Sequence, residues 1–440
     1  MRLTRRRLER LKRMSTSNKT HTIIEYGGFV RGRASFAGFV SLPDRTFDAL
    51  EAFILANYCE NDAGAIGLLS LSARRGIGRI ITARNYVGLI TMKDGTVIEI
   101  LPKIHGIGDN KEKTRNIFIE MLKTLQDVSF KASNTSSLRT DRLSLFEIFI
   151  AMFITEAARI TKHGLQSSYT PIEANERFFK GKLHVPQDIS HNYANRERCF
   201  VRYDEWSVNR PENRLIKATL LFLLGKTRDA RNRLNISRLL TFFNGVDCSV
   251  DFEADFTKCA ADRSMLHYAK ALPWCKVFLR GNSFSTFAGS EVAIALLFPM
   301  DKVFESYIAA KLRRYIPDGF EMRTQDRRYS LFDHPAQAFA LRPDIVLAHG
   351  GKPIVMDTKW KLLSNVRNYA ISQADMYQMY AYGKKYDAEK IILVYPQPEN
   401  LGGENISYQS SDGVKVEVRF IDLLQPDISA STIIDKFSAT

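Results

Sequence analysis

Two neighbouring stretches decide the fold of the C-terminal part of the chain: Arg342-Pro343-Asp344-Ile345-Val346-Leu347 and Pro353-Ile354-Val355-Met356-Asp357-Thr358-Lys359-Trp360. Each has the Ile- and Val-rich composition of a buried strand, and each carries one aspartate. Side chains along a strand repeat every two residues, so Lys359 lies on the same face as Asp357. Carboxylates are hard oxygen ligands that suit Mg²⁺. The two stretches therefore predict a metal-dependent phosphodiesterase site.

The residue types also predict how this site would work. Mg²⁺ bound by Asp344, Asp357 and the backbone carbonyl of Thr358 would polarise a scissile phosphate and help to generate the attacking hydroxide. Lys359 would orient or activate that water and offset the charge that builds on the phosphorane. One ion and two ions are both compatible with these residues.

A pattern of Asp followed by Asp/Glu-x-Lys also arises by chance, and this chain contains a second example. Asp94 precedes Asp109-Asn110-Lys111, but Asp94 falls in an expected turn and Asp109 in a glycine-flanked loop. Asp344 and Asp357 differ because each interrupts or adjoins an apolar run, where burying a carboxylate is costly without a compensating cation. The competing interpretation is a hairpin in which Asp344 and Lys359 form an ordinary ion pair.

Two further segments are expected to contribute to the site. Glu305 lies on an expected helix and would complete the acidic cluster directly or through water, although it could also be an exposed helix glutamate. Gln373 and Tyr377 share one face of a later helix, because residues four apart are neighbours on a helix surface. Gln378 and Tyr382 repeat this spacing. We prefer Gln373 and Tyr377 as the functional pair.

The hydrophobic pattern divides the 440 residues into four parts. Residues 1–20 form a basic arm, 21–110 a strand-rich domain, 111–285 a mainly helical middle region, and 286–440 an α/β domain. The α/β domain is expected to alternate helices at 303–315 and 372–386 with strands at 342–348, 353–360 and 390–395. The expected fold class is thus an α/β C-terminal domain preceded by a strand-rich domain and a helical region.

The net charge of +15 comes from 63 Lys and Arg against 48 Asp and Glu, and it favours a polyanionic partner such as nucleic acid. The arm at 1–20 supplies +7 of this charge, eight basic residues less one acidic residue, so the rest of the chain is only mildly basic. The arm is interpreted either as a solvated, frayed end or as a segment that touches DNA.

Other sequence features exclude several classes of protein. The five cysteines form no CxxC pair, which predicts reduced thiols and no structural zinc. The most apolar segment, Leu143 to Ile154, contains Glu147 and reads as a buried helix, so we expect a cytoplasmic protein with no membrane span. No GxxxxGK[ST] motif occurs, so we expect this chain to bind no nucleotide.

The two aspartate-bearing strands and the helix after them resemble the PD-(D/E)xK nuclease superfamily, and Gln373 to Tyr377 resembles the QxxxY element of its RecB-like branch. Further stretches resemble the McrC family, the nuclease subunit of the McrBC modification-dependent restriction system. In the order of that family they are Asn85-Tyr86-Val87-Gly88, Ile98 to Ile104, Gly181-Lys182-Leu183, Asp204 to Ser207, Asn213 to Lys217, and Tyr377 to Tyr382. The resemblance carries over Asp344, Asp357 and Lys359 as catalytic residues.

The resemblance to the McrC family also implies partners. Members act with McrB, a hexameric AAA+ GTPase that recognises DNA containing modified cytosine, and GTP-driven translocation then licenses cutting. The resemblance thus implies an McrB-like hexamer that carries the GTP, double-stranded DNA with modified cytosine as substrate, and a docking role for the region around 77–104. The expected activity is that of a Mg²⁺-dependent DNA endonuclease subunit.

Two other functions are compatible with the sequence. The chain could be a self-sufficient RecB-like DNase in repair or defence, with a DNA-binding N-terminal half. It could instead be a non-catalytic adaptor that regulates an AAA+ ring. The complete set of Asp344, Asp357 and Lys359 argues against the adaptor, because a vestigial site is expected to lose at least one member.

Overall fold

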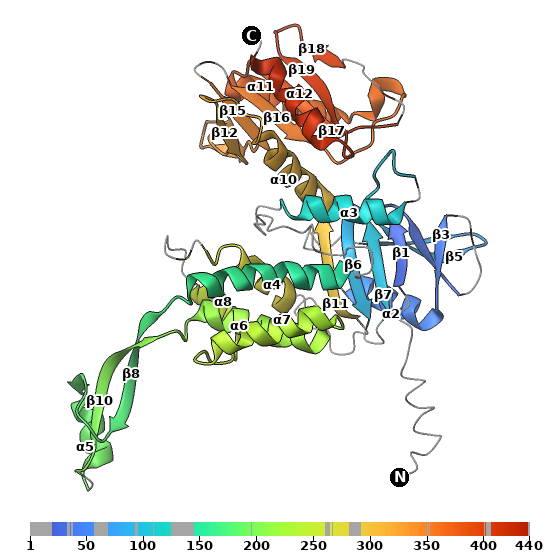
Figure 1. Ribbon diagram of the computed structural model, residues 1–440. Helices are drawn as coiled ribbons and strands as arrows, with labels where there is room; N and C mark the ends of the chain where they lie inside the picture. Colours follow the sequence, from blue (N-terminus) through green and yellow to red (C-terminus); the bar gives the residue numbers. More distant parts are fainter. Residues whose placement is uncertain are drawn as a thin grey trace, which may run out of the picture. The chain divides into compact units, whose positions relative to one another are not determined.

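The computed structural model of the chain describes residues 20–32, 36, 38–56, 69–92, 96–108, 110–124, 145–194, 196–259, 265, 267–280, 292–349, 351, 353–399, 401 and 406–438. The chain divides into two compact units, which are Met1–Ala132 with Phe284–Thr440, and Ser133–Ser283. Figure 1 shows the elements of each unit. Residues 1–19 of the expected basic arm, and Asp94 and Asp109 of the second chance pattern, lie outside the described residues.

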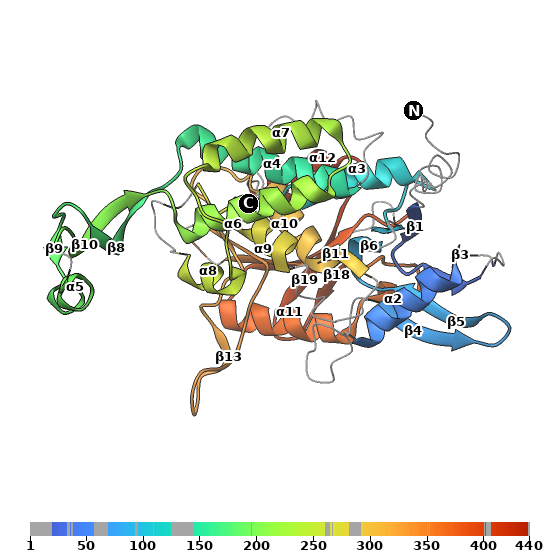
Figure 2. The same ribbon diagram turned by 90° about the horizontal axis from the view of Figure 1, so that it is seen from below.

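The N-terminal part of the first unit is built on two four-stranded sheets, with the strand orders β3-β2-β5-β4 and β1-β7-β6-β11. The strands are β1 (Thr20–Ile24), β2 (Gly28–Arg31), β3 (Phe39–Leu42), β4 (Leu69–Arg74), β5 (Gly78–Ala83), β6 (Tyr86–Met92), β7 (Val97–Leu101) and β11 (Val292–Pro299). Helix α2 (Asp44–Ala56) lies along the first sheet and contacts β2 and β4 (Figure 2). The alternating pattern at 21–110 thus produces a strand-rich region.

Strand β11 corrects the boundary that the sequence placed at residue 286. It pairs antiparallel with β6 from Val292 opposite Met92 to Pro299 opposite Tyr86, so residues 292–299 complete the N-terminal sheet. The strands approach closely at Gly88, where a Cβ atom would lie 2.0 Å from the carbonyl oxygen of Leu296. The α/β domain therefore starts at Met300. The local sequence pattern around residues 292–299 cannot show that this strand joins a sheet whose other strands lie about 200 positions earlier in the sequence.

Helix α3 (Lys111–Leu122) also belongs to the first unit, although the sequence placed it in the helical middle region. Its start is capped by Asn110, whose side-chain oxygen accepts a 3.0 Å hydrogen bond from the backbone N–H of Lys113. The helix packs against β7 and against the first helix of the C-terminal domain.

The second unit contains six of the described α-helices, five of which form a helical body with an aromatic core, together with a small sheet. The helices of this body are α4 (Leu145–His163), α6 (Pro211–Lys226), α7 (Ala230–Leu240), α8 (Phe252–Lys258) and α9 (Ala271–Arg280), and η3 (Thr241–Phe243) follows α7. Helix α4 ends at Gly164, which has φ +88°, and α6 begins with Pro211, as the sequence pattern predicts. Phe149 and Phe153 of α4 meet Trp274 and Phe278 of α9.

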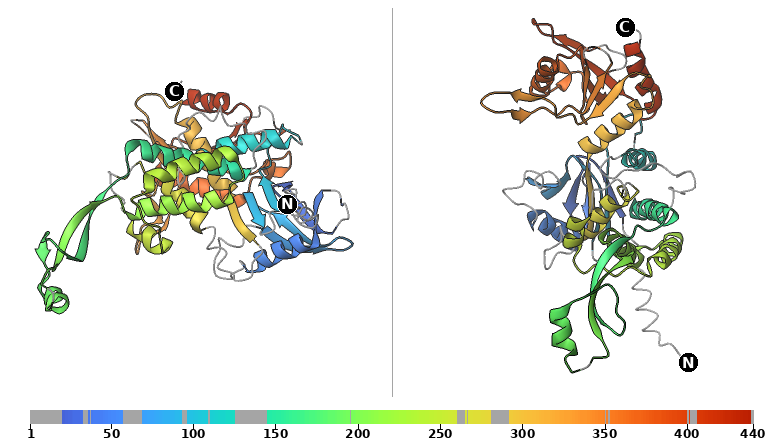
Figure 3. Two further views of the ribbon diagram at one scale, coloured as in Figure 1. Left: turned by 60° about the horizontal axis from the view of Figure 1, so that its bottom comes forward. Right: turned by 90° about the vertical axis from the view of Figure 1, so that its left-hand side faces the viewer.

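The small sheet of this unit was missed by the description of the middle region as mainly helical. It consists of β8 (Ser168–Glu176), β9 (Lys182–Leu183) and β10 (Cys199–Ser207), with helix α5 (Val185–Asn192) between β9 and β10. In Figure 3, β8 and β10 run together away from the helices of their own unit, with α5 at their far end. Most of their side chains are at least partly exposed, so no alternation of apolar and polar residues marks them as strands.

The C-terminal domain of the first unit is a mixed α/β structure around a six-stranded sheet of order β12-β15-β16-β17-β19-β18. The strands are β12 (Glu321–Thr324), β15 (Ile345–Ala348), β16 (Ile354–Thr358), β17 (Lys390–Pro396), β18 (Ser407–Gln409) and β19 (Lys415–Ile421). The other elements are α10 (Met300–Leu312), the hairpin β13 (Ser330–Phe332) and β14 (Ala338–Ala340), η5 (Arg367–Ala370), α11 (Gln373–Tyr386) and α12 (Pro426–Ser438).

Strand β16 lies in the middle of this sheet and is buried along its whole length. It pairs antiparallel with β15 and parallel with β17, which agrees with its continuous apolar run. Helix α11 contacts β16 and β17 through a buried face that includes Met379, Tyr382 and Tyr386. The sheet and α11 thus fix the position of the residues at the end of β16.

Within the described part of the chain, no helix combines the length and the apolar character that crossing a membrane requires. The four cysteines that the structure describes, at positions 199, 248, 259 and 275, are free thiols.

Candidate active site

Asp344 and Asp357 face each other at one end of the paired strands β15 and β16. Ile345 lies opposite Met356 in the register, so Asp344 falls just before β15 and next to Asp357 near the end of β16. The backbone N–H and the hydroxyl of Thr358 each donate a 2.8 Å hydrogen bond to the same oxygen of Asp344. The alternative hairpin pair between Asp344 and Lys359 does not form, because Lys359 turns to Asp357.

The carboxylate of Asp357 is 2% exposed and lies 2.5 Å from the ammonium nitrogen of Lys359. Burial, and then the nearby charge of Asp344, raise the pKa of Asp357 to about 7, against the opposing effect of Lys359. Burial by itself would lower the pKa of Lys359, but the charge and hydrogen bond of Asp357, together with the charges of Asp375 and Asp344, raise it. Lys359 is therefore a fixed positive charge beside two carboxylates.

Glu305 joins the same group from helix α10. Its carboxylate accepts a 2.8 Å hydrogen bond from Lys302, and it contacts the side-chain amide of Gln325. Burial, followed by the charge of Asp344, raises the pKa of Glu305. The simple alternative of an exposed helix glutamate does not hold for this side chain, which is largely buried.

Gln325 was not recognised from the sequence. Its amide nitrogen contacts Glu305 and lies 3.1 Å from Asp344, so it bridges two of the acidic groups. Its backbone N–H donates a 3.0 Å hydrogen bond to the carbonyl of Asp344, and its φ of +53° is uncommon for a residue other than glycine. No local pattern announces this residue, because it lies in the connection after β12 and acts through contacts with distant elements.

The choice between the two glutamine–tyrosine pairs on α11 is corrected by the structure. Gln378 accepts a 3.1 Å hydrogen bond from Lys359 and donates a 2.8 Å hydrogen bond to the hydroxyl of Tyr382. Gln373 contacts Tyr377 instead, and Tyr377 is 65% exposed. The helix turns the second pair toward β16, so Gln373 and Tyr377 are not brought to the carboxylates.

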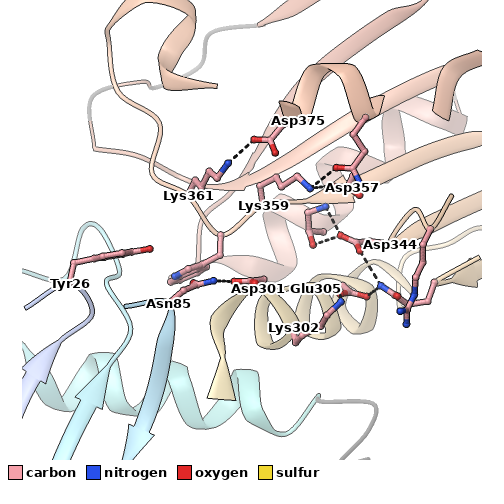
Figure 4. Close-up of a pocket in the computed structure, with 15 residues that line it drawn as sticks. Tyr26, Asn85, Asp301, Lys302, Glu305, Asp344, Asp357, Lys359, Lys361 and Asp375 are labelled. Atoms are coloured by element: carbon pink, nitrogen blue, oxygen red, sulfur yellow. Dashed lines mark hydrogen bonds and ion pairs between the residues drawn. The ribbon is translucent and has the colours of Figure 1, made fainter. Parts of the chain in front are cut away.

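The three carboxylates, Lys359, Gln325 and Gln378 line a cavity of about 490 Å³ in the first unit. Figure 4 shows Glu305, Asp344, Asp357 and Lys359 reaching it from the C-terminal domain, and Tyr26 and Asn85 reaching it from the N-terminal sheets. The second contribution was not expected from the sequence, which assigned the N-terminal region to protein docking. The cavity therefore combines acidic and basic groups from one domain with a tyrosine and an asparagine from the other.

The donor set fits a hard divalent cation chemically. Asp344 repels both Asp357 and Glu305, and this repulsion between buried carboxylates is what a bound cation would relieve. As the side chains stand, internal partners occupy them, and among the described residues no three His, Cys, Asp or Glu side chains are arranged to hold a metal ion. Asp344, Asp357 and the backbone carbonyl of Thr358 are the candidate ligands, with Glu305 available beside them.

Comparisons with known proteins place the chain in a family. A family model described as McrBC 5-methylcytosine restriction system component matches residues 81–396, and no curated protein matches. Two Thermococcus gammatolerans assemblies contain similar chains, at identities that inform on the fold alone. The refined half-complex of McrB AAA+ hexamers with bound McrC contains a chain 18% identical, with a TM-score of 0.64 over 95% of this chain and 100% of that one. A cryo-EM structure of the McrBC complex gives 20% identity and a TM-score of 0.48 over 68% of this chain and 88% of that one. Because the family model matches more than half of its length, the chain belongs to the McrBC 5-methylcytosine restriction system component family.

Proposed function

We propose that this chain is the Mg²⁺-dependent DNA endonuclease subunit of a restriction system that acts on DNA containing modified cytosine. The observation that carries the proposal is the convergence of Asp344, Asp357 and Lys359 at the end of β16, with Glu305 beside them in one cavity. Hydrolysis of a phosphodiester needs a held cation near the phosphate and a positive charge that offsets the developing phosphorane. This group of residues supplies the means for both.

In this proposal Asp344, Asp357 and the carbonyl of Thr358 would hold Mg²⁺, which supplies Lewis-acid polarisation of the phosphate and a bound water of lowered pKa. Thr358 keeps Asp344 in place through its two hydrogen bonds. Lys359 is positioned between Asp357 and Gln378, so its ammonium group can donate to the attacking water or to a phosphate oxygen. Gln378 thereby acts as a positioning residue.

We further propose that an McrB-like AAA+ GTPase hexamer activates the chain. Membership of the McrBC family supports this partner, and the fold is that of a chain solved in complex with McrB hexamers. The sequence contains no GxxxxGK[ST] motif, so the GTP would be bound by the partner subunit.

The test is a cleavage assay with the purified full chain, Mg²⁺, and DNA with or without methylated cytosine, in the presence and absence of the partner GTPase and GTP. We expect cutting only when the chain, the partner, GTP and methylated DNA are combined. Asp357→Asn should abolish cutting, and Asp412→Asn, a change of an exposed carboxylate outside the cavity, should not.

The other outcomes of this assay contradict the proposal in distinct ways. Cutting without partner or GTP would identify a self-sufficient DNase. Stimulation of GTP hydrolysis by the chain without any cutting would identify a non-catalytic adaptor. Equal cutting by the parent chain and Asp357→Asn would show that these carboxylates are not the active site.

A further inference from the structure

We propose that the N-terminal sheets form a substrate-contacting wall of the active site, in which the ring of Tyr26 packs against a nucleotide next to the scissile phosphate. The inference rests on the proposed nuclease function and adds a binding residue to it. It assigns part of the N-terminal region to the DNA substrate as well as to protein docking.

Tyr26 occupies an unusual position in the turn between β1 and β2. Its φ is +66°, a left-handed conformation that costs free energy for a bulky residue, and its side chain is 57% exposed. Backbone hydrogen bonds hold this turn, from Tyr26 N–H to Ala83 (3.1 Å) and from Gly27 N–H to Ile24 (2.8 Å). A large ring is thus held in a strained, fixed place while much of it remains accessible.

The turn is attached to the segment that directly follows β16, the strand that carries Asp357. Glu25, next to Tyr26, is buried and accepts a 2.8 Å hydrogen bond from the indole N–H of Trp360. Trp360 follows Lys359 in the chain and also packs against Phe304, next to Glu305, with ring centroids 5.3 Å apart. The position of Tyr26 relative to the catalytic group is therefore set by a short chain of contacts.

A second contact holds the same wall. The carbonyl of Asn85 accepts a 2.9 Å hydrogen bond from the backbone N–H of Met300, and the Asn85 side chain contacts Asp301. Both contacts are made to the first turn of α10, the helix that carries Glu305. Figure 4 shows Tyr26 and Asn85 on the side of the cavity away from Asp344 and Asp357.

The chemistry of the cavity indicates what Tyr26 would contact. The charged groups suit a phosphate and its metal ion, and a nucleotide that is unstacked from the duplex next to the scissile phosphate also exposes the flat face of its base. Of the two aromatic residues that line the cavity, Trp360 is 8% exposed and uses its N–H to bind Glu25, whereas Tyr26 is accessible. Stacking of a base on an aromatic ring is a sequence-tolerant interaction, which suits an enzyme whose partner selects the site.

The experiment compares Tyr26→Leu and Tyr26→Phe in the full chain assembled with its partner GTPase. Leucine removes the ring, phenylalanine keeps it, and both bear the same unfavourable φ as tyrosine. We measure binding of methylated duplex DNA with Ca²⁺ in place of Mg²⁺, and then kcat and KM for cutting with Mg²⁺. Tyr380→Leu, at an exposed tyrosine on α11 outside the cavity, is the matched control.

We expect Tyr26→Leu to raise Kd and KM about tenfold with kcat changed less than about twofold, because one stacked base is lost. Tyr26→Phe and Tyr380→Leu should stay within about twofold of the parent. Parent-like Kd and KM for Tyr26→Leu would overturn the inference while leaving the nuclease function intact. Equal losses in Tyr26→Phe and Tyr26→Leu would also overturn it, since the hydroxyl would then be the functional part. A parent complex that neither binds nor cuts DNA would remove the proposed function and this inference together.

Discussion

Glu25 and Trp360 are 335 positions apart in the sequence, yet the indole N–H of Trp360 donates a 2.8 Å hydrogen bond to the carboxylate of Glu25. This bond joins the first turn of the N-terminal sheets to the residue that follows Lys359. Burial is the main cause that raises the pKa of Glu25 to about 7, with the charge of Asp301 adding to it. The bond therefore contains a carboxyl group that titrates near neutral pH.

Replacing Glu25 should change how stability depends on pH. The pKa of Glu25 rises from 4.5 to about 7 on folding, so the folded state favours the protonated form. The stability associated with that proton is complete below pH 4.5 and is lost as the pH rises toward 7. Glu25→Gln does not titrate and can still accept from Trp360. Its free energy of unfolding should exceed that of the parent by up to about 3 kcal/mol at pH 8, and by little at pH 4.5.

Denaturant unfolding at both pH values measures this difference. Glu399→Gln, at an exposed glutamate of the same unit, should show no such change with pH. A Glu25→Gln advantage that is the same at both pH values would contradict the predicted titration.

Mg²⁺ should stabilise the protein through the carboxylates at the end of β16. A ligand that binds only the folded state adds about 2.7 kcal/mol to the free energy of unfolding at a hundredfold excess over its Kd. Asp357→Asn should remove most of this increment, because it deletes one proposed ligand. It also removes the repulsion between Asp357 and Asp344 that a bound cation would relieve. Unfolding titrations with and without Mg²⁺, and with Asp412→Asn as control, measure the effect without any need for cleavage. An increment of parental size in Asp357→Asn would place the binding site elsewhere.

Local rules were sufficient for the central part of this site. The apolar runs, the period of two along a strand and the cost of burying a carboxylate together predicted that Asp344, Asp357 and Lys359 would meet, and in the structure they do. The prediction used only residues within about one hairpin of each other. Tyr26 and Glu25 could not be found in this way, because they come from a turn more than 300 positions earlier, and Glu25 acts through Trp360. Gln325 lies only 19 positions before Asp344, but no local pattern marks the connection that carries it.

The position of strand β11 was hidden for the same reason. Its apolar run stands directly before α10, inside the range 286–440 that the sequence assigned to the α/β domain, while its partner β6 ends at Met92. The choice between the two glutamine–tyrosine pairs on α11 was different, because the positions of the apolar and aromatic residues along this helix could have indicated the buried pair. Met379, Tyr382 and Tyr386 form the buried face of that helix, and Gln378 with Tyr382 lies nearer to this face than Gln373 with Tyr377.

The two glutamines of α11 offer a matched pair of substitutions. Gln378→Ala removes the acceptor that fixes Lys359, and hydrogen bonds to charged groups contribute about 1.5–3 kcal/mol. We expect kcat for cutting to fall by at least about tenfold in Gln378→Ala, with KM little changed. Gln373→Ala should stay within about twofold of the parent, because Gln373 contacts the exposed Tyr377 and does not line the cavity. The opposite ranking would restore the first pair as the functional one.

Stability of the second unit should depend on Glu147, a buried carboxylate in the first turn of α4. One oxygen accepts the backbone N–H of Arg228 at 2.7 Å, and the other accepts the hydroxyl of Thr227 at 2.7 Å and the side-chain amide of Asn232 at 2.8 Å. These contacts join the start of α4 to the loop before α7 and to the first turn of that helix. Glu147, the charged residue in the first turn of α4, therefore anchors this apolar helix to its neighbours.

Glu147→Gln replaces one of the two accepting oxygens with an NH₂ group. An NH₂ group cannot accept a hydrogen bond, so at least one buried donor loses its partner. We expect the free energy of unfolding to fall by about 2–3 kcal/mol. Hydrogen exchange should show the loss of protection first at the backbone amides of Arg228 and Asp229, which donate to Glu147, while amides of β16 in the other unit keep their protection. Glu205→Gln, at an exposed position of the second unit, should leave both measurements unchanged. Unaltered protection around Arg228 in Glu147→Gln would show that the loop before α7 is held by other contacts.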